Sequence, residues 1–434
     1  MSDTADYRTS KPLFNKGRTG WALFDWANQG FTTIVITFIF GVYFQSGVVG
    51  DPVQGQALWA TAISISAAVI AILAPILGAL ADLGGRRKPW VVGFSWACIL
   101  LTVGLYFVLP DPSYTFYMMV VVASANIAYE LAIVFNNAML SDLVDRPRLA
   151  KLGGVAWSGG YFGGLITLVI ALAIFFGGEG MGLNEETQQP VRATALVVAA
   201  WFAIFLIPFM LWTPDRAPTG RSIAECISQG LGQLWHTLKT IFSSDRNMFG
   251  FLMGRMFYAD AVATVFSIGA VYASSRFDLA MTELILFGIL LNVFSGLGGV
   301  VFAMIEERLG TKSVILTSIV GLTISATIML FMDSFNLFVI VACLFGVFVG
   351  PIQQASRTML AKLAPLDVQA ELFGLYALTG KATSWAGPLA VAVVTAWAGR
   401  EGLANANQLG MLTILPFFVI GFVIMLFVKE QYRE

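Results

Sequence analysis

GALADLGGRRK, residues 78–88, is the stretch that decides the expected fold, because the chain carries a second version of it. AMIEERLGTKS, residues 303–313, aligns with it without gaps. Three aligned pairs keep their chemical character: Asp82 with Glu307, Gly85 with Gly310 and Arg87 with Lys312. Small residues let two membrane helices approach closely, and basic residues anchor the ends of a span at the lipid headgroups. The repeat therefore predicts two related halves, each with such a loop on the same side of a membrane.

Two further matches extend this repeat. Residues 138–160 align with residues 358–380 without gaps. A weaker match sets LFDWANQ over YADAVAT, which places Asp25 opposite Asp260. Two related halves of membrane-spanning helices are the architecture expected of a transporter in which one half rocks against the other.

Composition places the chain among membrane proteins. Hydrophobic residues make up 57% of it and charged residues only 12%, whereas soluble domains carry about 25% charged residues. Apolar runs long enough for a spanning helix, rather than for the shorter alternating strands of a barrel, occur repeatedly along the chain. They fall at 20–45, 56–81, 89–109, 114–140, 151–177, 191–213, 253–275, 281–305, 313–332, 335–361, 371–398 and 405–428. We therefore expect an all-α membrane protein with about 12 transmembrane helices in two pseudo-symmetric six-helix halves.

Basic residues set the expected orientation. Lys and Arg gather in the N-terminal tail, in alternate loops and in the long interval after the sixth span, and such a bias marks the cytoplasmic side. Both termini are therefore expected in the cytoplasm. The chain then divides into an N-terminal tail (1–19), a first six-helix half (20–213), a cytoplasmic linker (214–252), a second half (253–428) and a C-terminal tail (429–434).

The linker has a pattern of its own. Apolar residues recur there at helical spacing, with polar residues between them: Ile223, Ile227, Leu231, Leu234, Leu238, Ile241 and Phe242. This pattern predicts an amphipathic helix that lies on the cytoplasmic face and joins the two halves.

Several classes of function are disfavoured. His236 is the only histidine, and Cys98, Cys226 and Cys343 lie far apart, so neither metal-ligand spacing nor a Ser–His arrangement is present. The net charge of −1 gives no basic bias toward nucleic acid, and no phosphate-binding loop occurs. We expect no enzyme activity, no cofactor, no metal site and no nucleic-acid partner.

Five residues of the first copy match the signature loop of a known superfamily: Gly78, Asp82, Gly85, Arg86 and Arg87. On them the chain resembles the major facilitator superfamily, and the resemblance implies that this loop takes part in gating. Residues 21–31, 356–365 and 373–389 look like the family of autophagy-related vacuolar amino-acid effluxers and their bacterial permease relatives. Two positions depart from that family: Ala259 and Ala261 flank Asp260 where it commonly has Asn and Gly, and Ala377 stands where an acidic residue is common.

Ionisable groups inside the predicted spans are the candidate functional residues, because each costs roughly 3 kcal/mol or more to insert. They are Asp25, Glu130, Arg255, Asp260, Arg357 and Lys381. Counted from the cytoplasmic ends, Lys381 and Glu130 lie about 15 Å deep, and Asp25 and Arg357 about 6–8 Å. The alignment with Asp25 places Asp260 in the shallow layer too, with residues 247–254 in the surface segment and Arg255 at the membrane boundary.

The resemblance implies that spans 1, 4, 7 and 10 surround a central cavity and that spans 2, 5, 8 and 11 line the interface of the halves. Lys381 would then bind the carboxylate or phosphate of a solute, or pair with Glu130 as a proton switch; a static ion pair and a lipid-facing lysine are the structural alternatives. The expected substrate-binding residues are Lys381, Glu130, Asn126, Arg357, Tyr376 and Trp385. The expected proton-coupling residues are Glu130, Asp25 and Asp260.

These expectations describe a secondary active transporter that works by alternating access. The resemblance favours an amino acid or another small carboxylate as solute and a bacterial inner membrane as location. We expect proton coupling, a functional monomer, and a solute, protons and the lipid bilayer as the only partners. A transporter of sugars or phosphorylated metabolites and a membrane sensor that does not transport remain alternatives.

Overall fold

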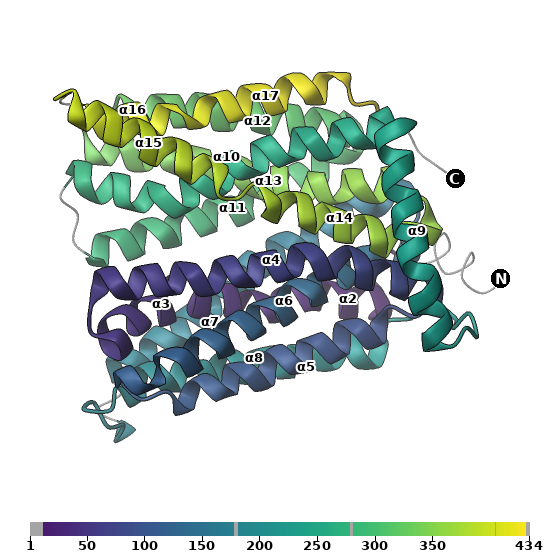
Figure 1. Cartoon of the computed structure of the whole chain (residues 1–434), viewed down its shortest axis with the longest axis horizontal. Helices are drawn as coiled ribbons and strands as arrows, with labels where there is room; N and C mark the ends of the chain where they lie inside the picture. Colours follow the sequence, from purple (N-terminus) through teal and green to yellow (C-terminus); the bar gives the residue numbers. More distant parts are fainter. Residues whose placement is uncertain (1–11, 178–180, 278–280, 404, 431–434) are drawn as a thin grey trace.

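The computed structural model describes residues 12–177, 181–277, 281–403 and 405–430, so most of the predicted N-terminal tail and residues 431–434 of the C-terminal tail lie outside the described residues. The described part is helical, with turns and short irregular connections and no strand. Figure 1 shows the long helices side by side in two groups, the first half of the chain in one and the second half in the other. This arrangement confirms the all-α fold in two halves.

Each half is built from a consecutive set of helices. The first contains α2 (Lys16–Gly30), α3 (Phe40–Val42), α4 (Pro52–Gly84), α5 (Lys88–Gly104), α6 (Thr115–Leu143), α7 (Leu149–Gly177) and α8 (Gln189–Trp212). The second contains α10 (Arg246–Phe277), α11 (Met281–Leu309), α12 (Thr311–Leu330), α13 (Phe335–Leu363), α14 (Gln369–Ala382), α15 (Ala386–Arg400), α16 (Ala406–Leu412) and α17 (Ile414–Phe427). Between them α9 (Ile223–Ser243) crosses one end of the bundle, which we call the linker end (Figure 1).

Eleven stretches among the described residues are long and apolar enough to cross a membrane. The eleventh predicted span, 371–398, is not among them, because it is broken into α14 and α15 by a turn at residues 383–385. Pro388 lies in the first turn of α15, where its missing N–H weakens the link to the preceding turn without by itself ending a helix. The interruption follows directly on the turn that carries Lys381.

The first span changes its winding halfway along. After α2 the chain continues as π-helix over η1 (Phe31–Phe38), and again over η2 (Tyr43–Val49). The hydroxyls of Thr32 and Thr33 both donate to the carbonyl of Gln29, at 3.1 and 2.9 Å, and so compete with the backbone ladder at this point. π-Turns concentrate at functional sites, and this one starts beside the central cavity described below.

The two copies of the loop at residues 78–88 and 303–313 have the same backbone turn. Gly85 and Gly310 both adopt φ +84°, a conformation that favours glycine. The side chains differ from the alignment by one position: Glu307 is exposed, whereas Glu306 is buried and accepts a bond of 2.7 Å from the hydroxyl of Thr311. The backbone repeat is therefore preserved, while the buried acid has moved along the helix.

The two halves approach each other closely near the linker end. A Cβ on Gly78 of α4 would collide with the backbone carbonyl of Ala370 in α14, and one on Gly154 of α7 would collide with the side chain of Ala303 in α11. Only glycine permits such close approach of two helices. The linker end of the bundle is therefore closed in this structure.

Candidate functional site

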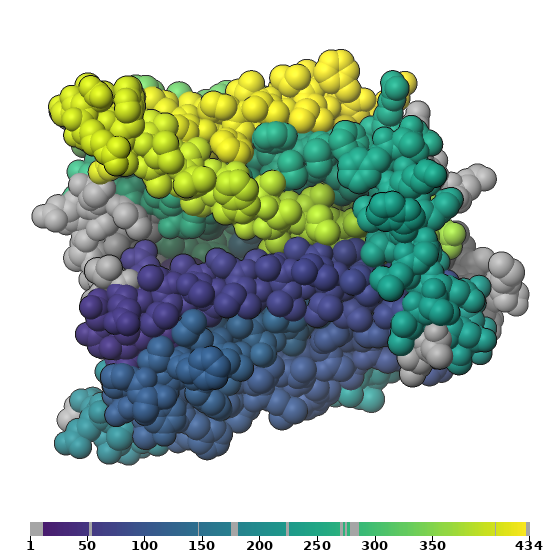
Figure 2. Space-filling model, viewed as in Figure 1, coloured from purple at the N-terminus to yellow at the C-terminus, as the bar shows by residue number. Residues whose placement is uncertain are grey.

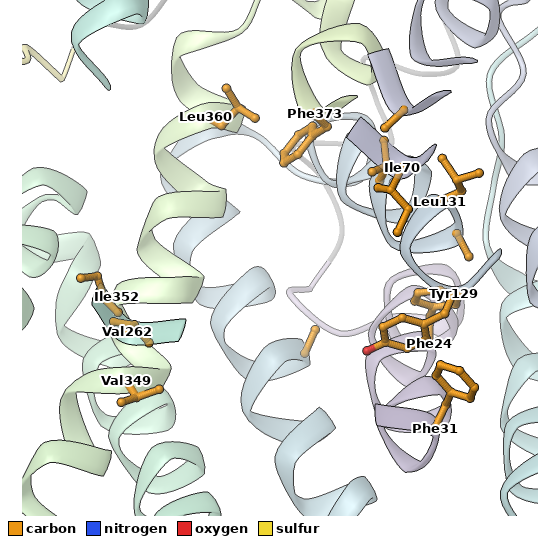
Figure 3. Close-up of a cluster of buried hydrophobic side chains, with 14 of the residues drawn as sticks. Phe24, Phe31, Ile70, Tyr129, Leu131, Val262, Val349, Ile352, Leu360 and Phe373 are labelled. Atoms are coloured by element: carbon orange, nitrogen blue, oxygen red, sulfur yellow. The ribbon is translucent and has the colours of Figure 1, made fainter. Parts of the chain in front are cut away.

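A cavity of about 450 Å³ lies between the two halves. Its lining side chains come from α2, η1, α6, α7, α10, α13 and α14. These elements include all four spans that the resemblance to the superfamily places around a central cavity. Three of its lining residues are labelled among the buried side chains of Figure 3, with Tyr129 on one side of the view and Val262 and Ile352 on the other. Its volume is in the range of small-molecule sites, about 300–1,000 Å³.

Lys381 and Glu130 form an ion pair across this cavity. Nζ of Lys381 donates to Oε1 of Glu130 at 2.6 Å, and the two side chains remain 27% and 24% exposed. Lys381 lies in the last turn of α14, where the helix dipole favours a cation. The pair thus connects the second half to the first and stays accessible from the cavity.

A second ion pair is almost completely buried. Nη1 of Arg357 on α13 donates to Asp25 at 3.0 Å and to the side-chain oxygen of Asn137 at 2.9 Å, and Nη2 donates to the carbonyl of Gly153 at 2.5 Å. The guanidinium also lies 5.0 Å from the ring centre of Trp157, close enough for a cation–π contact. Because a buried charge needs such partners, Arg357 ties α13 to three helices of the first half.

Arg255 is a site residue that the sequence analysis left at the membrane boundary. α10 begins at Arg246, so Arg255 lies well inside the span and lines the cavity. Its guanidinium lies 3.3 Å from the ring centre of Tyr376 and donates to the Tyr376 carbonyl at 2.8 Å and to Thr379 Oγ1 at 3.3 Å. The helical run that starts before Met248 was the signal that could have found it.

Asp260 also lies deeper than the alignment with Asp25 suggested. It sits near the middle of α10 with an exposure of only 2%, and its Oδ2 accepts a bond of 3.0 Å from the backbone N–H of Gly387. Its Oδ1 has no hydrogen-bond partner among the described residues. The shallow placement was wrong, and Asp260 instead holds the start of α15 where the eleventh span is interrupted.

Polar side chains complete the cavity wall. The hydroxyls of Tyr258 and Ser356 are 2.7 Å apart, and Nε2 of Gln353 donates to the hydroxyl of Tyr161 at 3.4 Å. All of these residues line the cavity, and the predicted binding residue Tyr376 does so too. The described residues contain no group of His, Cys, Asp and Glu that could hold a metal ion.

Two predicted binding residues do not lie at the cavity. Asn126 is buried and donates to the hydroxyl of Ser66 at 2.8 Å, which joins α6 to α4. Trp385 is 62% exposed, and its ring nitrogen donates to the Ala382 carbonyl at the break in the eleventh span. Their polar groups therefore serve helix contacts in this structure, and we remove both from the site.

The predicted gating loop forms a buried network at the linker end. Arg87 pairs with Asp82 at 2.5 Å and with Asp142 at 2.9 Å, and Asp142 also pairs with Arg216 at 2.5 Å. Burial alone would lower the pKa of Arg87, but the two carboxylates raise it above its ordinary value and keep the guanidinium charged. Arg86, by contrast, is exposed.

This network also reaches the second half. Oδ2 of Asp82 accepts the backbone N–H of Glu371 at 2.9 Å, and Arg87 donates to the carbonyl of Leu366 at 3.3 Å. The loop therefore ties α4 to the start of α14 while the linker end is closed.

Known proteins share both the sequence and the fold. The family model described as "Vacuole effluxer Atg22 like" matches residues 47–153 and 144–433. The chain is 28% identical over 421 residues to an uncharacterized MFS-type transporter, YxiO, of Bacillus subtilis, a match that covers 96% of each protein. It is 23% identical to autophagy-related protein 22 of Pichia angusta, covering 76% of this chain and 68% of that protein.

Two solved structures show the same fold at 14% identity. A bacterial homologue of the iron transporter ferroportin, in an outward-facing state, superposes with a TM-score of 0.70 and covers 96% of this chain and 99% of its own. The fucose:proton symporter of E. coli superposes with a TM-score of 0.67 and covers 95% and 98%. Because the family model spans most of its length, the chain belongs to the Atg22-like vacuole effluxer family, and it is a membrane transporter of the major facilitator superfamily.

Proposed function

We propose that the protein is a proton-coupled secondary transporter that moves a small carboxylate, an amino acid first, by alternating access. One observation carries the proposal: the ion pair of Lys381 and Glu130 bridges the two halves and remains accessible from the cavity. A charge pair kept inside the membrane and open to a cavity is typical of a transport pathway.

The charges of the cavity favour an amino acid. Lys381 and Arg255 offer two cationic groups, and Glu130 offers an anionic group between the halves. A solute carboxylate would pair with one of the cations, and its ammonium would donate a hydrogen bond to a side-chain oxygen of residue 130, so that both ends of a zwitterion find a partner. Gln29, Thr32 and Gln353 add polar groups that could orient the rest of the molecule.

The same pair supports the proposal of proton coupling. Protonation of Glu130 would remove the charge that holds Lys381, and the released lysine would then be available for a solute carboxylate. Asp260 is a second candidate, because one of its carboxylate oxygens lacks a partner among the described residues and the other holds the start of α15. Asp25 is already committed to Arg357, so we assign it chiefly to closing the linker end.

Alternating access is supported by the contacts between the halves. The pair of Asp25 and Arg357, the gating loop and the glycine contacts all join the halves on the linker side of the cavity. By the positive-inside rule this side faces the cytoplasm, so the structure would correspond to a cytoplasm-closed state. We assign the chain to a bacterial inner membrane, with both termini cytoplasmic, as a functional monomer.

Reconstitution tests the proposal. The wild type, Lys381→Ala and Glu130→Gln would be placed in liposomes, and the uptake of labelled amino acids would be followed with and without an inward proton gradient. We expect gradient-driven uptake by the wild type and its loss in both variants. Of the two variants, only Glu130→Gln should keep the solute exchange that needs no gradient. Lys239→Ala, at an exposed position of α9, is the matched control.

Equal gradient-driven uptake by all four proteins would contradict the role of the ion pair. Sugars and phosphorylated metabolites are the second class of candidate solutes, since aromatic side chains such as Trp157 and Tyr161 also line the cavity. Competition with unlabelled ligands of each class separates them from amino acids. Absence of flux for every class would favour the sensor that binds without transport.

A further inference from the structure

The linker helix α9 presents three different faces. At about 100° per residue its positions fall into three sectors, each of roughly one third of the circumference. The first sector is buried against the bundle and contains Cys226, Gly230, Leu234 and Ile241. The second is exposed and apolar, and contains Ile227, Leu231, Trp235 and Phe242, with exposures of 52%, 56%, 72% and 69%. The third is exposed and polar, and contains Glu225, Ser228, Gln229, His236 and Lys239.

A helix that only covered a protein surface in water would need the first and third sectors alone. The second sector leaves four large apolar side chains uncovered on one stripe, which soluble surfaces avoid. Trp235 is the most exposed of the four, and tryptophan is enriched where a membrane meets water. The sequence pattern predicted an amphipathic helix. It could not show that the apolar residues form two neighbouring faces, one packed on the bundle and one exposed.

The position of α9 identifies what covers this stripe. Figures 1 and 2 show α9 crossing the bundle at the linker end, on the outer face of the molecule and across the direction of the spans. Gly230 packs beside Leu80 and Leu83, which lie in the last turns of α4. α9 therefore lies at the level where the apolar belt of the spans ends, and its exposed stripe continues that lipid-facing belt.

α9 is also attached to both halves of the closed gate. On one side Gly230 contacts α4. On the other, Nε2 of Gln233 donates to the buried carboxylate of Glu371 at 2.9 Å, at the start of α14. The backbone N–H of the same Glu371 is held by Asp82 of the gating loop.

We propose that α9 is an interfacial helix whose apolar stripe binds the headgroup–acyl boundary of the bilayer, and that in this position it clamps α14 to α4. Opening the linker end must separate α4 from α14, since they are closed on each other at Gly78. α9 must then give up either its packing on α4 or its bond to Glu371. Membrane binding of the stripe therefore stabilises the state in which the linker end is closed.

Spin-label accessibility tests the membrane contact in the full-length protein. In a background with the three cysteines replaced by serine, single labels would be attached after Leu231→Cys on the apolar stripe and after Gln229→Cys on the polar face. In lipid nanodiscs we expect the label at 231 to collide mainly with oxygen, and the label at 229 mainly with a water-soluble nickel chelate. Equal nickel accessibility at both positions, or spin–spin broadening at 231 from a second copy, would overturn the proposal.

Distance measurements test the clamp without any solute, so their outcome does not depend on the proposed transport activity. Labels at the exposed positions Lys151 and Glu307 report the separation of α7 and α11 at the linker end. We expect Gln233→Leu to raise the ratio of open to closed populations by roughly fivefold, the factor for one net hydrogen bond. The separate double change Leu231→Ser with Trp235→Ser should raise the same ratio, because it removes the apolar contact with the bilayer.

Gln229→Leu is the matched control, because it changes a glutamine one helical turn away that has no role in the clamp. It should leave the distance distribution unchanged. If Gln233→Leu and the double variant both remain monodisperse and keep the wild-type distribution, the clamp is refuted. The distance distributions should also be compared between nanodiscs and detergent. If transfer to detergent changes the distribution of the double variant but not that of the wild type, the result would also count against a lipid contact of the stripe.

Discussion

The buried pair of Arg357 and Asp25 shows how a single charge can fix the packing of a membrane protein. The guanidinium, from the second half, has three oxygen acceptors and two tryptophan rings around it, all contributed by the first half. Such a network stabilises only while it is complete, because a charge left alone in the interior carries its full desolvation cost.

We therefore expect Arg357→Gln and Asp25→Asn each to destabilise the protein, by about 3–5 kcal/mol when a buried charge is left unpaired. The double variant should lose less than the sum of the two single variants, because no unpaired charge remains. Thermal unfolding in one detergent would measure the three losses. Additive losses would show that the two side chains do not interact in the way the structure indicates.

Asp260 can be separated from a purely structural role by a conservative change. In Asp260→Asn the amide oxygen can still accept the N–H of Gly387, whereas Asp260→Ala leaves that N–H without its partner. We expect Asn to keep the thermal stability and solute exchange of the wild type but to abolish gradient-driven uptake. Ala should also lower stability, by about 1–3 kcal/mol. Unchanged gradient-driven uptake in the Asn variant would remove Asp260 from proton coupling.

At the scale of elements, the same capping arrangement occurs at both copies of the repeated loop. Oδ1 of Asp215 accepts the backbone N–H of Arg87 at the start of α5, and Oε2 of Glu430 accepts that of Lys312 at the start of α12. Each acid follows the last helix of its half. A carboxylate at a helix N-terminus is favoured by the helix dipole, so both halves use the same solution.

Glu430 makes this capping sensitive to acid. Burial would raise its pKa, but bonds from Lys362 and from the N–H of Lys312 hold the pKa below the ordinary 4.5. A carboxylate with a lowered pKa contributes stability above the unfolded-state value and loses it as the pH falls through its folded pKa. We expect Glu430→Gln to be less stable than the wild type at pH 7 and to show a smaller loss on acidification below about pH 4.5. Unfolding temperatures of both proteins at pH 7 and at the acidic pH would measure the difference. If the wild type and Glu430→Gln lose the same stability on acidification, Glu430 does not contribute to the acid sensitivity.

The break in the eleventh span shows where sequence reasoning stopped. Hydropathy and the internal repeat were enough to predict the helical halves, because burial in lipid imposes long apolar runs. The pairing of Lys381 with Glu130 was one of several alternatives, and it also needed the layout of spans that the resemblance to the superfamily implies. Pro388 did not by itself indicate a break, since many spans contain proline: α4, α8 and α13 continue through theirs. What distinguishes α14 and α15 is Asp260 reaching across to Gly387, and that contact is tertiary.

The predicted depths of Asp260 and Arg255 were wrong for a related reason. A repeat aligned by local similarity placed Asp260 opposite Asp25, although α10 begins several residues before the aligned segment suggested. Counting along the apolar run would have placed both residues correctly. Asn126 and Trp385 show the other limit, because a polar side chain in a span bonds a neighbouring helix or its own backbone as readily as it lines a cavity.

For the whole molecule, closure of the linker end depends on how closely α4 and α14 approach. Gly78 faces the backbone of Ala370, so any side chain there must push the two helices apart. The same displacement would stretch the bond between Asp82 and the N–H of Glu371. Glycine at this position is therefore a condition for the closed state.

We accordingly expect Gly78→Ala to shift the population toward a state that is open at the linker end, while Gly84→Ala, on the same helix with open space around it, leaves the population unchanged. A backbone collision of this kind cannot be relieved by a rotamer change, and overpacking costs about 1–3 kcal/mol, which corresponds to a population shift of roughly fivefold or more. The distance between labels at Lys151 and Glu307 would measure the shift. An unchanged distance in a folded Gly78→Ala variant would mean that α4 and α14 stay together during transport, and alternating access would then have to proceed by another movement of the halves.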